Sequence, residues 1–359
     1  MTDTAVIVRE TSALASVQRV HSPCAIEGRD IIVTASVQGF KVVVKKTEFF
    51  TPGVNLVPSD PQYATGVLCV FFQPDSLLDS DNDEFKFLDS SRGRLIATKK
   101  MFGVYSQGLC VPLSVLAKYG LDPSRVVETQ DVTLETKTSK YVAPEELPQY
   151  KGISGIPPGN PFPTNQVPKT DEPSLQTSLK YLKMIKGRRV TITIKMDGSS
   201  MTVTSDGKLC GRNYQWTDRT PSTEAYYKVN DRFQIVEKIR GSGYSFQGEL
   251  VGPKINKNTA GIGDLEWMVF NVCKDYVYLP HSEVKRLCEE YKFQTVPCLY
   301  EDVSADELPF HTIDDWLEFA DNQVYANQAR AEGIVVKTSD GLSPRISFKV
   351  LSRVYCAKK

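Results

Sequence analysis

The sequence predicts an α+β protein in which a small β-rich domain precedes a larger domain of mixed strands and helices. Three observations support this prediction. Short β-like runs fill residues 13–115, prolines crowd residues 143–173, and longer strand-like and helix-like runs follow from residue 174 onward. Strands and helices that do not alternate strictly favour an α+β domain built on antiparallel sheets.

The first domain is expected at residues 1–142. Its strand-like runs are separated by turn residues, and they cover 31–33, 40–44 and 67–72. Gln38-Gly39 predicts a turn between the first two runs, and Pro74-Asp75 ends the third. Several short strands at this spacing predict a small barrel or sandwich. The acidic stretch 79–84 is expected to be an exposed loop.

A linker or extended strap is predicted at residues 143–173, because proline density is high there and apolar runs are few. Its prolines are Pro144, Pro148, Pro157, Pro158, Pro161, Pro163, Pro168 and Pro173.

The second domain is expected at residues 174–359. Its predicted strands are 190–195, 199–204, 244–251, 265–273, 332–337 and 345–350, and its predicted helices are 222–239, 282–292 and 313–327. Asp206-Gly207 predicts a hairpin turn. Thr312 with Asp315 predicts an N-terminal cap for the last helix.

Composition argues against a globally basic nucleic-acid-binding protein, a membrane-spanning protein and a secreted protein. The 43 basic and 43 acidic residues among 359 cancel, so a nucleic acid would have to bind a local basic surface. No apolar run reaches the ~18 residues of a membrane helix, and the N-terminus lacks the blocks of a signal peptide, so an intracellular protein is expected. Any one of the clustered basic residues, taken singly, is expected to be solvated surface: Lys41, Lys45, Lys46, Arg92, Arg94, Lys99, Lys100, Lys183, Lys186, Arg188 and Arg189.

The eight cysteines form no C-x-x-C pair and the three histidines lie far from any such spacing, so a structural zinc site is not expected. The cysteines are predicted to be small buried residues. The chain also lacks a G-x-x-x-x-G-K-[ST] loop, which excludes nucleotide chemistry of the P-loop kind.

The most informative motif is Lys195-Met196-Asp197-Gly198 at the end of the run 190–195, which reads as a strand with one buried face. A lysine at a strand end can be directed into a cleft. It is a nucleophile only when its amine is neutral, and burial or a nearby cation favours that form by lowering the pKa.

Further segments also end predicted strands with charged or aromatic residues. In order with the lysine motif, the set is 195–198, 211–213, 246–250, 269–272, 332–337 and 346–350. This set resembles the covalent nucleotidyltransferase superfamily of nucleic-acid ligases and messenger-RNA capping enzymes. The segment 168–173, with 16–20, 42–46, 73–76 and 106–109, is similar to ATP-dependent RNA ligases of the Naegleria and Deinococcus type, which have an N-terminal OB-like domain.

The resemblance implies a role for each site residue. Lys195 would attack the α-phosphorus of ATP and hold AMP, and Lys337 and Lys349 would contact the α-phosphate. Asp197, Glu249 and Glu332 would hold Mg²⁺ or Mn²⁺ through water. Phe270 would stack on adenine, and Arg212 would reach the ribose or a 5′-phosphate. Ser347 stands where the family often has another lysine.

The resemblance also implies a substrate. DNA ligases and capping enzymes carry an OB domain after the last lysine motif, whereas only nine residues follow Val350. An RNA ligase that seals nicked RNA-containing duplexes is therefore expected, with RNA held by the OB-like domain through Lys45, Lys46, Lys99 or Lys100. A monomer without an obligate protein partner is also expected. A GTP-dependent guanylyltransferase and a non-catalytic RNA-binding protein remain as alternatives.

Overall fold

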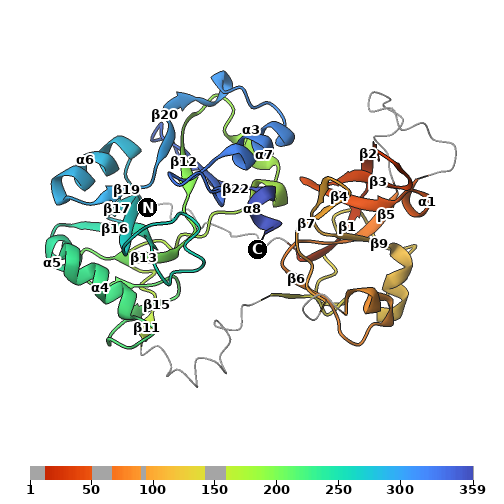
Figure 1. Cartoon of the computed structure of the whole chain (residues 1–359), viewed down its shortest axis with the longest axis horizontal. Helices are drawn as coiled ribbons and strands as arrows, with labels where there is room; N and C mark the ends of the chain where they lie inside the picture. Colours follow the sequence, from red (N-terminus) through yellow and green to blue (C-terminus); the bar gives the residue numbers. More distant parts are fainter. Residues whose placement is uncertain (1–12, 51–66, 90–93, 142–158, 359) are drawn as a thin grey trace, which may run out of the picture. The chain divides into compact units, whose positions relative to one another are not determined.

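The computed structural model describes residues 13–50, 67–89, 94–141 and 159–358 (Figure 1). The chain divides into two compact units. Unit 1 consists of Met1–Tyr141 with Gln176–Ser178, and unit 2 consists of Val142–Leu175 with Leu179–Lys359. The first part of the proline-rich segment, residues 143–158, lies outside the described residues. No described helix combines the length and the hydropathy needed to cross a membrane.

Unit 1 is built from short antiparallel strands, which confirms the predicted β-rich domain. Its strands are β1 (Ala15–Arg19), β2 (His21–Ile26), β3 (Arg29–Val37), β4 (Phe40–Lys45), β5 (Leu68–Phe72), β6 (Ser76–Leu77), β7 (Lys99–Met101), β8 (Val104–Ser106), β9 (Leu109–Pro112) and β10 (Ser139–Lys140). Its helical turns are α1 (Lys46–Phe49), η2 (Asp83–Leu88) and η3 (Leu113–Tyr119). The strand orders are β1-β5-β9, β2-β3-β4, β7-β8 and β10-β6.

Strand β5 lies between two hydrophobic clusters, which explains its continuous apolar sequence. Cys69 and Phe71 pack with β3 and β4, whereas Val70 and Phe72 pack with β1 and η3. Side chains of a strand point alternately to opposite faces, so both faces of β5 are buried.

Two predictions for unit 1 need correction. The stretch 79–84 is not simply an exposed loop, because Asn82 is buried and caps η2 by accepting a hydrogen bond from the Glu84 N–H at 3.0 Å. Arg94 is not solvated surface. It is buried and donates to Asp89 and to the carbonyl of Asn82, both at 2.6 Å. The predicted turn at Gln38-Gly39 is confirmed between β3 and β4.

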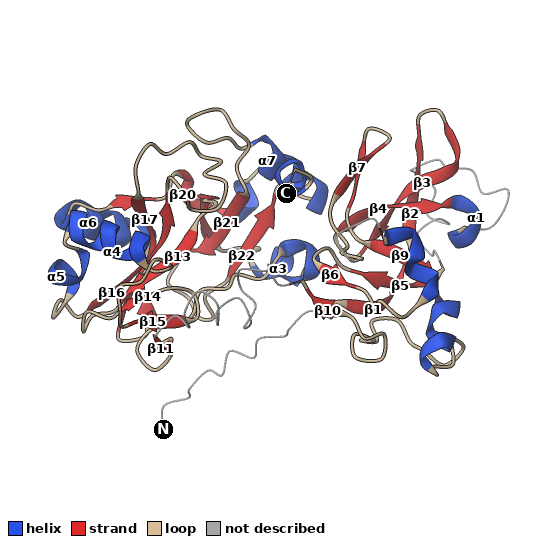
Figure 2. Cartoon of the chain, turned by 60° about the horizontal axis from the view of Figure 1, so that its bottom comes forward, coloured by secondary structure: helices blue, strands red, loops and turns tan. Residues whose placement is uncertain are grey.

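Unit 2 contains two sheets, which are antiparallel except where β19 pairs with β17 (Figure 2). The larger has the order β11-β15-β14-β13-β16-β17-β18, and the smaller has the order β20-β12-β21-β22. The strands are β11 (Gly159–Pro161), β12 (Arg189–Lys195), β13 (Ser199–Val203), β14 (Leu209–Cys210), β15 (Tyr214–Trp216), β16 (Tyr244–Val251), β17 (Glu266–Lys274), β18 (Val277–Tyr278), β19 (Gln294–Thr295), β20 (Cys298–Ser304), β21 (Gly333–Thr338) and β22 (Ser347–Leu351).

Helices cover both sheets of unit 2. They are α3 (Lys180–Met184), α4 (Glu224–Phe233), α5 (Ile235–Ile239), α6 (His281–Tyr291), η6 (Ala305–Glu307), α7 (Ile313–Asn322) and α8 (Arg353–Cys356), while η5 (Leu175–Thr177) is shared with unit 1. Val229, Ile235 and Leu287 from three of these helices pack on the larger sheet. Trp316 of α7 packs on the smaller sheet against Phe348.

The predicted strands are present with small shifts, but two helices differ. The helix expected at 222–239 is broken at Gln234, whose φ of +52° ends α4. The helix expected at 313–327 ends at Asn322. Its predicted cap is confirmed, because Thr312 accepts from the Asp315 N–H at 3.2 Å and Asp315 accepts from the Thr312 N–H at 2.7 Å.

Two further differences concern burial. Both faces of β12 are buried, since Thr191 and Thr193 are as enclosed as Val190 and Ile192. Not every cysteine is buried, because Cys24 and Cys298 are exposed.

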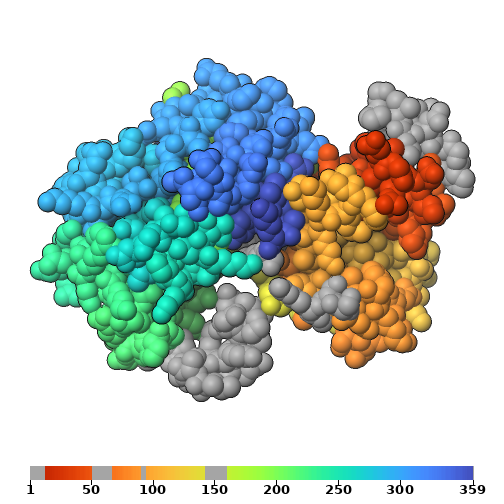
Figure 3. Space-filling model, viewed as in Figure 1, coloured from red at the N-terminus to blue at the C-terminus, as the bar shows by residue number. Residues whose placement is uncertain are grey.

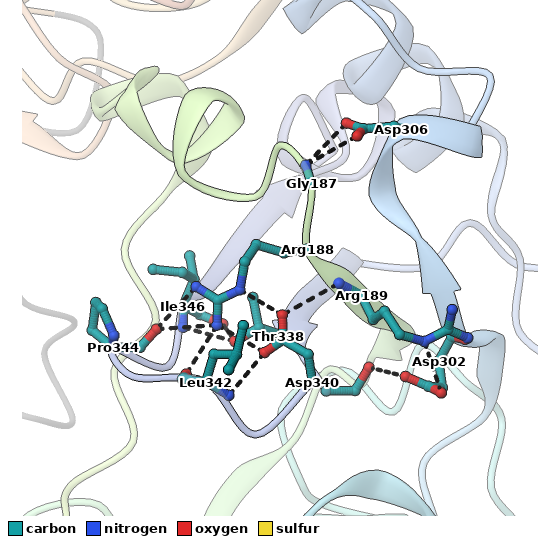
Figure 4. A network of polar contacts seen from close by, with 11 residues as sticks. Gly187, Arg188, Arg189, Asp302, Asp306, Thr338, Asp340, Leu342, Pro344 and Ile346 are labelled. Carbon is teal, nitrogen blue, oxygen red and sulfur yellow. Dashed lines mark hydrogen bonds and ion pairs between the residues drawn. The ribbon is translucent and has the colours of Figure 1, made fainter.

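A polar network anchors the start of β12 (Figure 4). Arg188 donates to Asp340 at 2.5 and 2.8 Å and to the carbonyl of Leu342 at 2.9 Å. The Gly187 N–H donates to both oxygens of Asp306 at 3.1 Å. Arg188 and Asp340 are 14% and 12% exposed, so this ion pair is nearly enclosed. It fixes β12 at the end opposite Lys195, and it shows that Arg188 is not solvated surface.

Candidate active site

Lys195 is the last residue of β12 and pairs with Gly333 of β21. Its Nζ donates to Glu332 Oε2 at 2.5 Å. Gly333 has a φ of +152°, and a Cβ there would lie 2.1 Å from the Val350 carbonyl oxygen, so only glycine fits between β12 and β22. The Glu-Gly pair therefore places a carboxylate beside the lysine.

Two opposing effects act on the pKa of Lys195. Burial lowers it, but the charges of Glu332 and Glu249 raise it and outweigh burial, so the pKa lies well above its ordinary value. The carboxylates around Lys195 therefore favour its protonated form, and the amine becomes a nucleophile only when a proton leaves it.

The hydroxyl of Tyr325 connects the backbone around the lysine motif. It donates to the Lys195 carbonyl and accepts from the Asp197 and Glu332 N–H groups, each at 3.1 Å. These backbone groups lie at or close to Lys195–Gly333, the last pair of the β12–β21 ladder. The Tyr325 hydroxyl therefore supplies hydrogen-bond partners for backbone groups where the ladder ends. The sequence analysis did not identify Tyr325, because nothing in the pattern places the residues after α7 here.

Asp197 is buried, and its carboxylate has local partners. Asn256 Nδ2 donates to Asp197 Oδ1 at 3.0 Å, and Thr259 Oγ1 donates to Oδ2 at 3.1 Å. Both partners come from the loop after β16. This loop is held in turn by Asn327 Nδ2, which donates to the Thr259 carbonyl at 3.0 Å; in Figure 3 the teal residues of the loop lie beside the blue residues around α7.

Glu249 of β16 faces the same site. Burial raises its pKa to about 7, with further raising by Glu332 and Asp197, although Lys195 opposes this rise. The loop carrying Gly198 lies very close to β16, since a Cβ on Gly198 would be 2.3 Å from the Leu250 carbonyl oxygen. That close approach brings the carboxylates of Asp197 and Glu249 toward the charged amine of Lys195, which Glu332 also contacts.

Lys337 lies inside unit 2, next to Phe270. Its Nζ donates to the Phe270 carbonyl at 2.9 Å and to Asn271 Oδ1 at 3.0 Å, and lies 5.2 Å from the Phe270 ring centroid. Burial lowers the pKa of Lys337 to about 7, although the charge of Glu172 opposes this. Phe270 itself is only partly buried, at the edge of a small cluster with Ile194.

Lys349 lies on β22, where its N–H donates to the Pro173 carbonyl at 2.8 Å. Burial lowers its pKa, and the neighbouring charge of Lys195 lowers it further. Ser347 on the same strand pairs with Lys337 in the ladder and donates to Glu172 at 3.3 Å.

Arg345, which the sequence analysis did not single out, lies next to these strands. It donates to Asn271 Oδ1 at 3.3 Å, and its guanidinium carbon lies 4.2 Å from the Tyr278 ring centroid. Asn271 thus accepts from two cations, Lys337 and Arg345.

Arg212 lies at the exposed edge of the site. It donates to Asp171 at 2.9 Å, with both side chains about half exposed. Asp171 accepts from Arg212, whereas Glu172 and Pro173 both contact β22, so these three residues lie beside the predicted site segments within unit 2.

The carboxylates do not form a ready-made metal cage. No three His, Cys, Asp or Glu side chains in the described ranges converge as direct ligands. Asp197 is occupied by two side-chain donors and Glu332 by Lys195. Burial is the main cause of the raised pKa of Glu249, and the charges of Glu332 and Asp197 add to it. Such a donor set fits a hydrated divalent cation that keeps most of its waters.

Comparison with known proteins agrees with this geometry. Residues 188–351 match the RNA ligase family, and residues 14–113 match an OB-fold domain family. No curated protein sequence matches the chain.

Three similar solved structures are of Naegleria gruberi RNA ligase. A variant with ATP and Mn is 27% identical, with a TM-score of 0.77, and covers 96% of this chain and 99% of its own. A variant with AMP and Mn is 26% identical, with a TM-score of 0.76, covering 97% and 99%. A structure with PPi is 27% identical, with a TM-score of 0.75, covering 96% and 98%. Residues 188–351 therefore form a domain of the RNA ligase family, and an OB-fold domain precedes it within residues 14–113.

Proposed function

We propose that this RNA ligase uses ATP to adenylylate Lys195, transfers AMP to an RNA 5′-phosphate, and joins that end to a 3′-OH at nicks in duplexes. The observation that carries the proposal is the position of Lys195 at a strand end, where its Nζ lies 2.5 Å from Glu332. Glu249 and Lys349 are close enough to interact electrostatically with its amine. The similar Naegleria gruberi structures with ATP, AMP and PPi support it.

In the first step the Nζ lone pair of Lys195 attacks the α-phosphorus of ATP. A P–N bond forms, the bond to the bridging oxygen breaks, and pyrophosphate leaves with that electron pair. The proton on Nζ must leave first, and Glu332 is the hydrogen-bonded group nearest to take it. Lys337 and Lys349 offset the negative charge that develops on the phosphate oxygens.

We assign the remaining site residues as follows. Asp197, Glu249 and Glu332 hold hydrated Mg²⁺ or Mn²⁺, which when bound neutralises carboxylate charge around Lys195 and so lowers its pKa. Phe270 stacks on adenine with its accessible face. Arg212 exchanges its surface partner Asp171 for a ribose hydroxyl or the 5′-phosphate of RNA.

We further propose that residues 1–142 hold the RNA duplex and that residues 174–359, with the site segment 168–173, carry out the chemistry. RNA strands in A-form geometry are recognised through phosphates and 2′-hydroxyls, which matches a domain that reads shape rather than sequence. Lys45, Lys46, Lys99 and Lys100 are the candidate phosphate contacts.

The test is a sealing assay on a nicked duplex with a labelled 5′-phosphate. Sealing that needs ATP and a divalent cation, and that prefers RNA on the 3′-OH side, supports the proposal. Sealing driven only by GTP, or RNA binding without any sealing, would replace it with the guanylyltransferase or the binding-protein alternative.

A further inference from the structure

The tip of the β7–β8 hairpin in unit 1 presents an aromatic side chain that the fold does not require. Met101 pairs with Val104, and the two residues between them have φ of +52° at Phe102 and +83° at Gly103. Glycine and asparagine normally occupy such turns, because a side chain with a Cβ is strained at positive φ. Phe102 is 49% exposed, so burial does not compensate for this strain.

An arginine from a neighbouring hairpin stacks on this ring. The guanidinium carbon of Arg29, the first residue of β3, lies 4.4 Å from the Phe102 ring centroid. Figure 2 shows the hairpins that carry β3 and β7 projecting on the same side of unit 1. Arg29 and Phe102 therefore place a cation and an aromatic ring together at the surface.

The rest of the hairpin is basic and apolar. Lys99 and Lys100 are exposed, and Met101 is 37% exposed. Within the described ranges, neither Arg29 nor Lys100 has a carboxylate partner, although Glu27 and Asp30 are nearby in sequence. Arg29, Lys99, Lys100, Met101 and Phe102 are called the hairpin surface below.

We propose that the hairpin surface binds a base left unpaired next to the duplex that residues 1–142 are proposed to hold, together with the phosphates that flank this base. The inference rests on the proposed function and specifies which part of the OB-fold domain contacts RNA. Aromatic rings and guanidinium planes are the groups on which unpaired bases stack, and lysines neutralise the phosphates on either side. A nucleic acid is complementary to both the charge and the ring, whereas an apolar protein partner would leave the cations unused.

The experiment measures binding of fluorescein-labelled single-stranded RNA and of a duplex of the same sequence to the full chain by anisotropy. We expect Phe102→Ala to weaken single-strand binding by at least about fivefold, with a smaller loss for the duplex, whose bases are already stacked. Lys100→Ala is expected to weaken both about equally and to reduce their salt dependence. The matched control is Phe87→Ala, because Phe87 is 63% exposed elsewhere in unit 1.

A second substitution separates binding from folding. Phe102→Gly removes the ring but suits the positive φ, so it should raise Tm while weakening single-strand binding as much as Phe102→Ala does. Loss of affinity together with a gain in stability cannot be explained by misfolding.

Single-strand affinity within twofold of the unmodified chain for both Phe102 variants would overturn the inference, as would an equal loss in Phe87→Ala. Self-adenylylation of Lys195 is measured in the same preparations. If it is intact while the Phe102 variants bind normally, only the hairpin inference fails. If it is absent in the unmodified chain, the proposed function fails.

Discussion

Lys195 Nζ and Glu332 Oε2 are 2.5 Å apart; Lys195 ends β12, and Glu332 directly precedes β21, the strand that pairs with β12. This ion pair favours the protonated amine, because the charges of Glu332 and Glu249 raise the pKa of Lys195 well above its ordinary value. The attack proposed for Lys195 therefore requires that binding of substrate and cation weaken the hold of Glu332 on the lysine proton.

Glu332→Gln tests this dependence. Removing the carboxylate lowers the pKa of Lys195, so the rising limb of the pH–rate profile for self-adenylylation should move to lower pH. The maximal rate should fall about 100-fold or more, since a proton acceptor and an electrostatic contact are lost. Single-turnover rates between about pH 6 and pH 10 measure both effects. A limb that moves to higher pH would contradict the assigned role.

Tyr325→Phe removes one hydroxyl and leaves the Lys195 carbonyl and the Asp197 and Glu332 N–H groups without that partner. Buried unpaired groups of this kind cost about 1–3 kcal/mol each if no water replaces the hydroxyl. We expect a lower free energy of unfolding and slower adenylylation with a nearly unchanged KM for ATP. Tyr227→Phe, at a tyrosine outside this network, is the control. Unfolding in urea and single-turnover kinetics are the measurements.

Lys337 should couple nucleotide binding to proton uptake. Its pKa is about 7 because it is buried, and a phosphate beside it would favour the charged form. ATP should therefore bind more tightly at about pH 6 than at about pH 9, with a proton taken up between these limits. Calorimetry in buffers of different ionisation enthalpy measures the uptake. Lys337→Met should abolish this proton uptake. An unchanged uptake in the variant would show that another group takes up the proton.

The Arg188–Asp340 pair should make stability depend on acid pH. The ion pair holds the pKa of Asp340 at about 2, below its ordinary value of 3.8. Its contribution is therefore complete above about pH 4 and is lost as pH falls toward 2. Arg188→Ala, which leaves the carboxylate without its cation and with only backbone N–H donors, should cost about 3 kcal/mol at neutral pH. Urea unfolding at about pH 7 and about pH 3 should show a smaller difference at the lower pH.

The strand framework could be predicted from the sequence because its signals are local. Alternating and continuous apolar runs located six strands of unit 2 within a few residues, although they did not predict β20, and Asp206-Gly207 marked a hairpin that the structure confirms. The break at Gln234 was not predictable, because a glutamine in a helical pattern gives no sign that it will adopt a positive φ.

The sequence indicated which residues to consider for the site, but it could not indicate their pKa values. Ordered motifs indicated which residues to consider, whereas the pKa of Lys195 depends on how near two carboxylates lie, and that distance is set by the sheet and by Gly198 and Gly333. Tyr325 and Arg345 were missed for a related reason. Tyr325 lies in a segment whose sequence shows no motif, and Arg345 directly precedes the motif 346–350 without being part of it.

The most direct test of the central claim is incubation of the purified chain with α-labelled ATP and Mg²⁺, followed by denaturing electrophoresis. We predict a label that survives denaturation, is absent with α-labelled GTP, and is lost in Lys195→Ala while RNA binding is kept. A label that persists in Lys195→Ala, or no label after bound AMP has been removed with pyrophosphate, would contradict a covalent lysyl-AMP on Lys195.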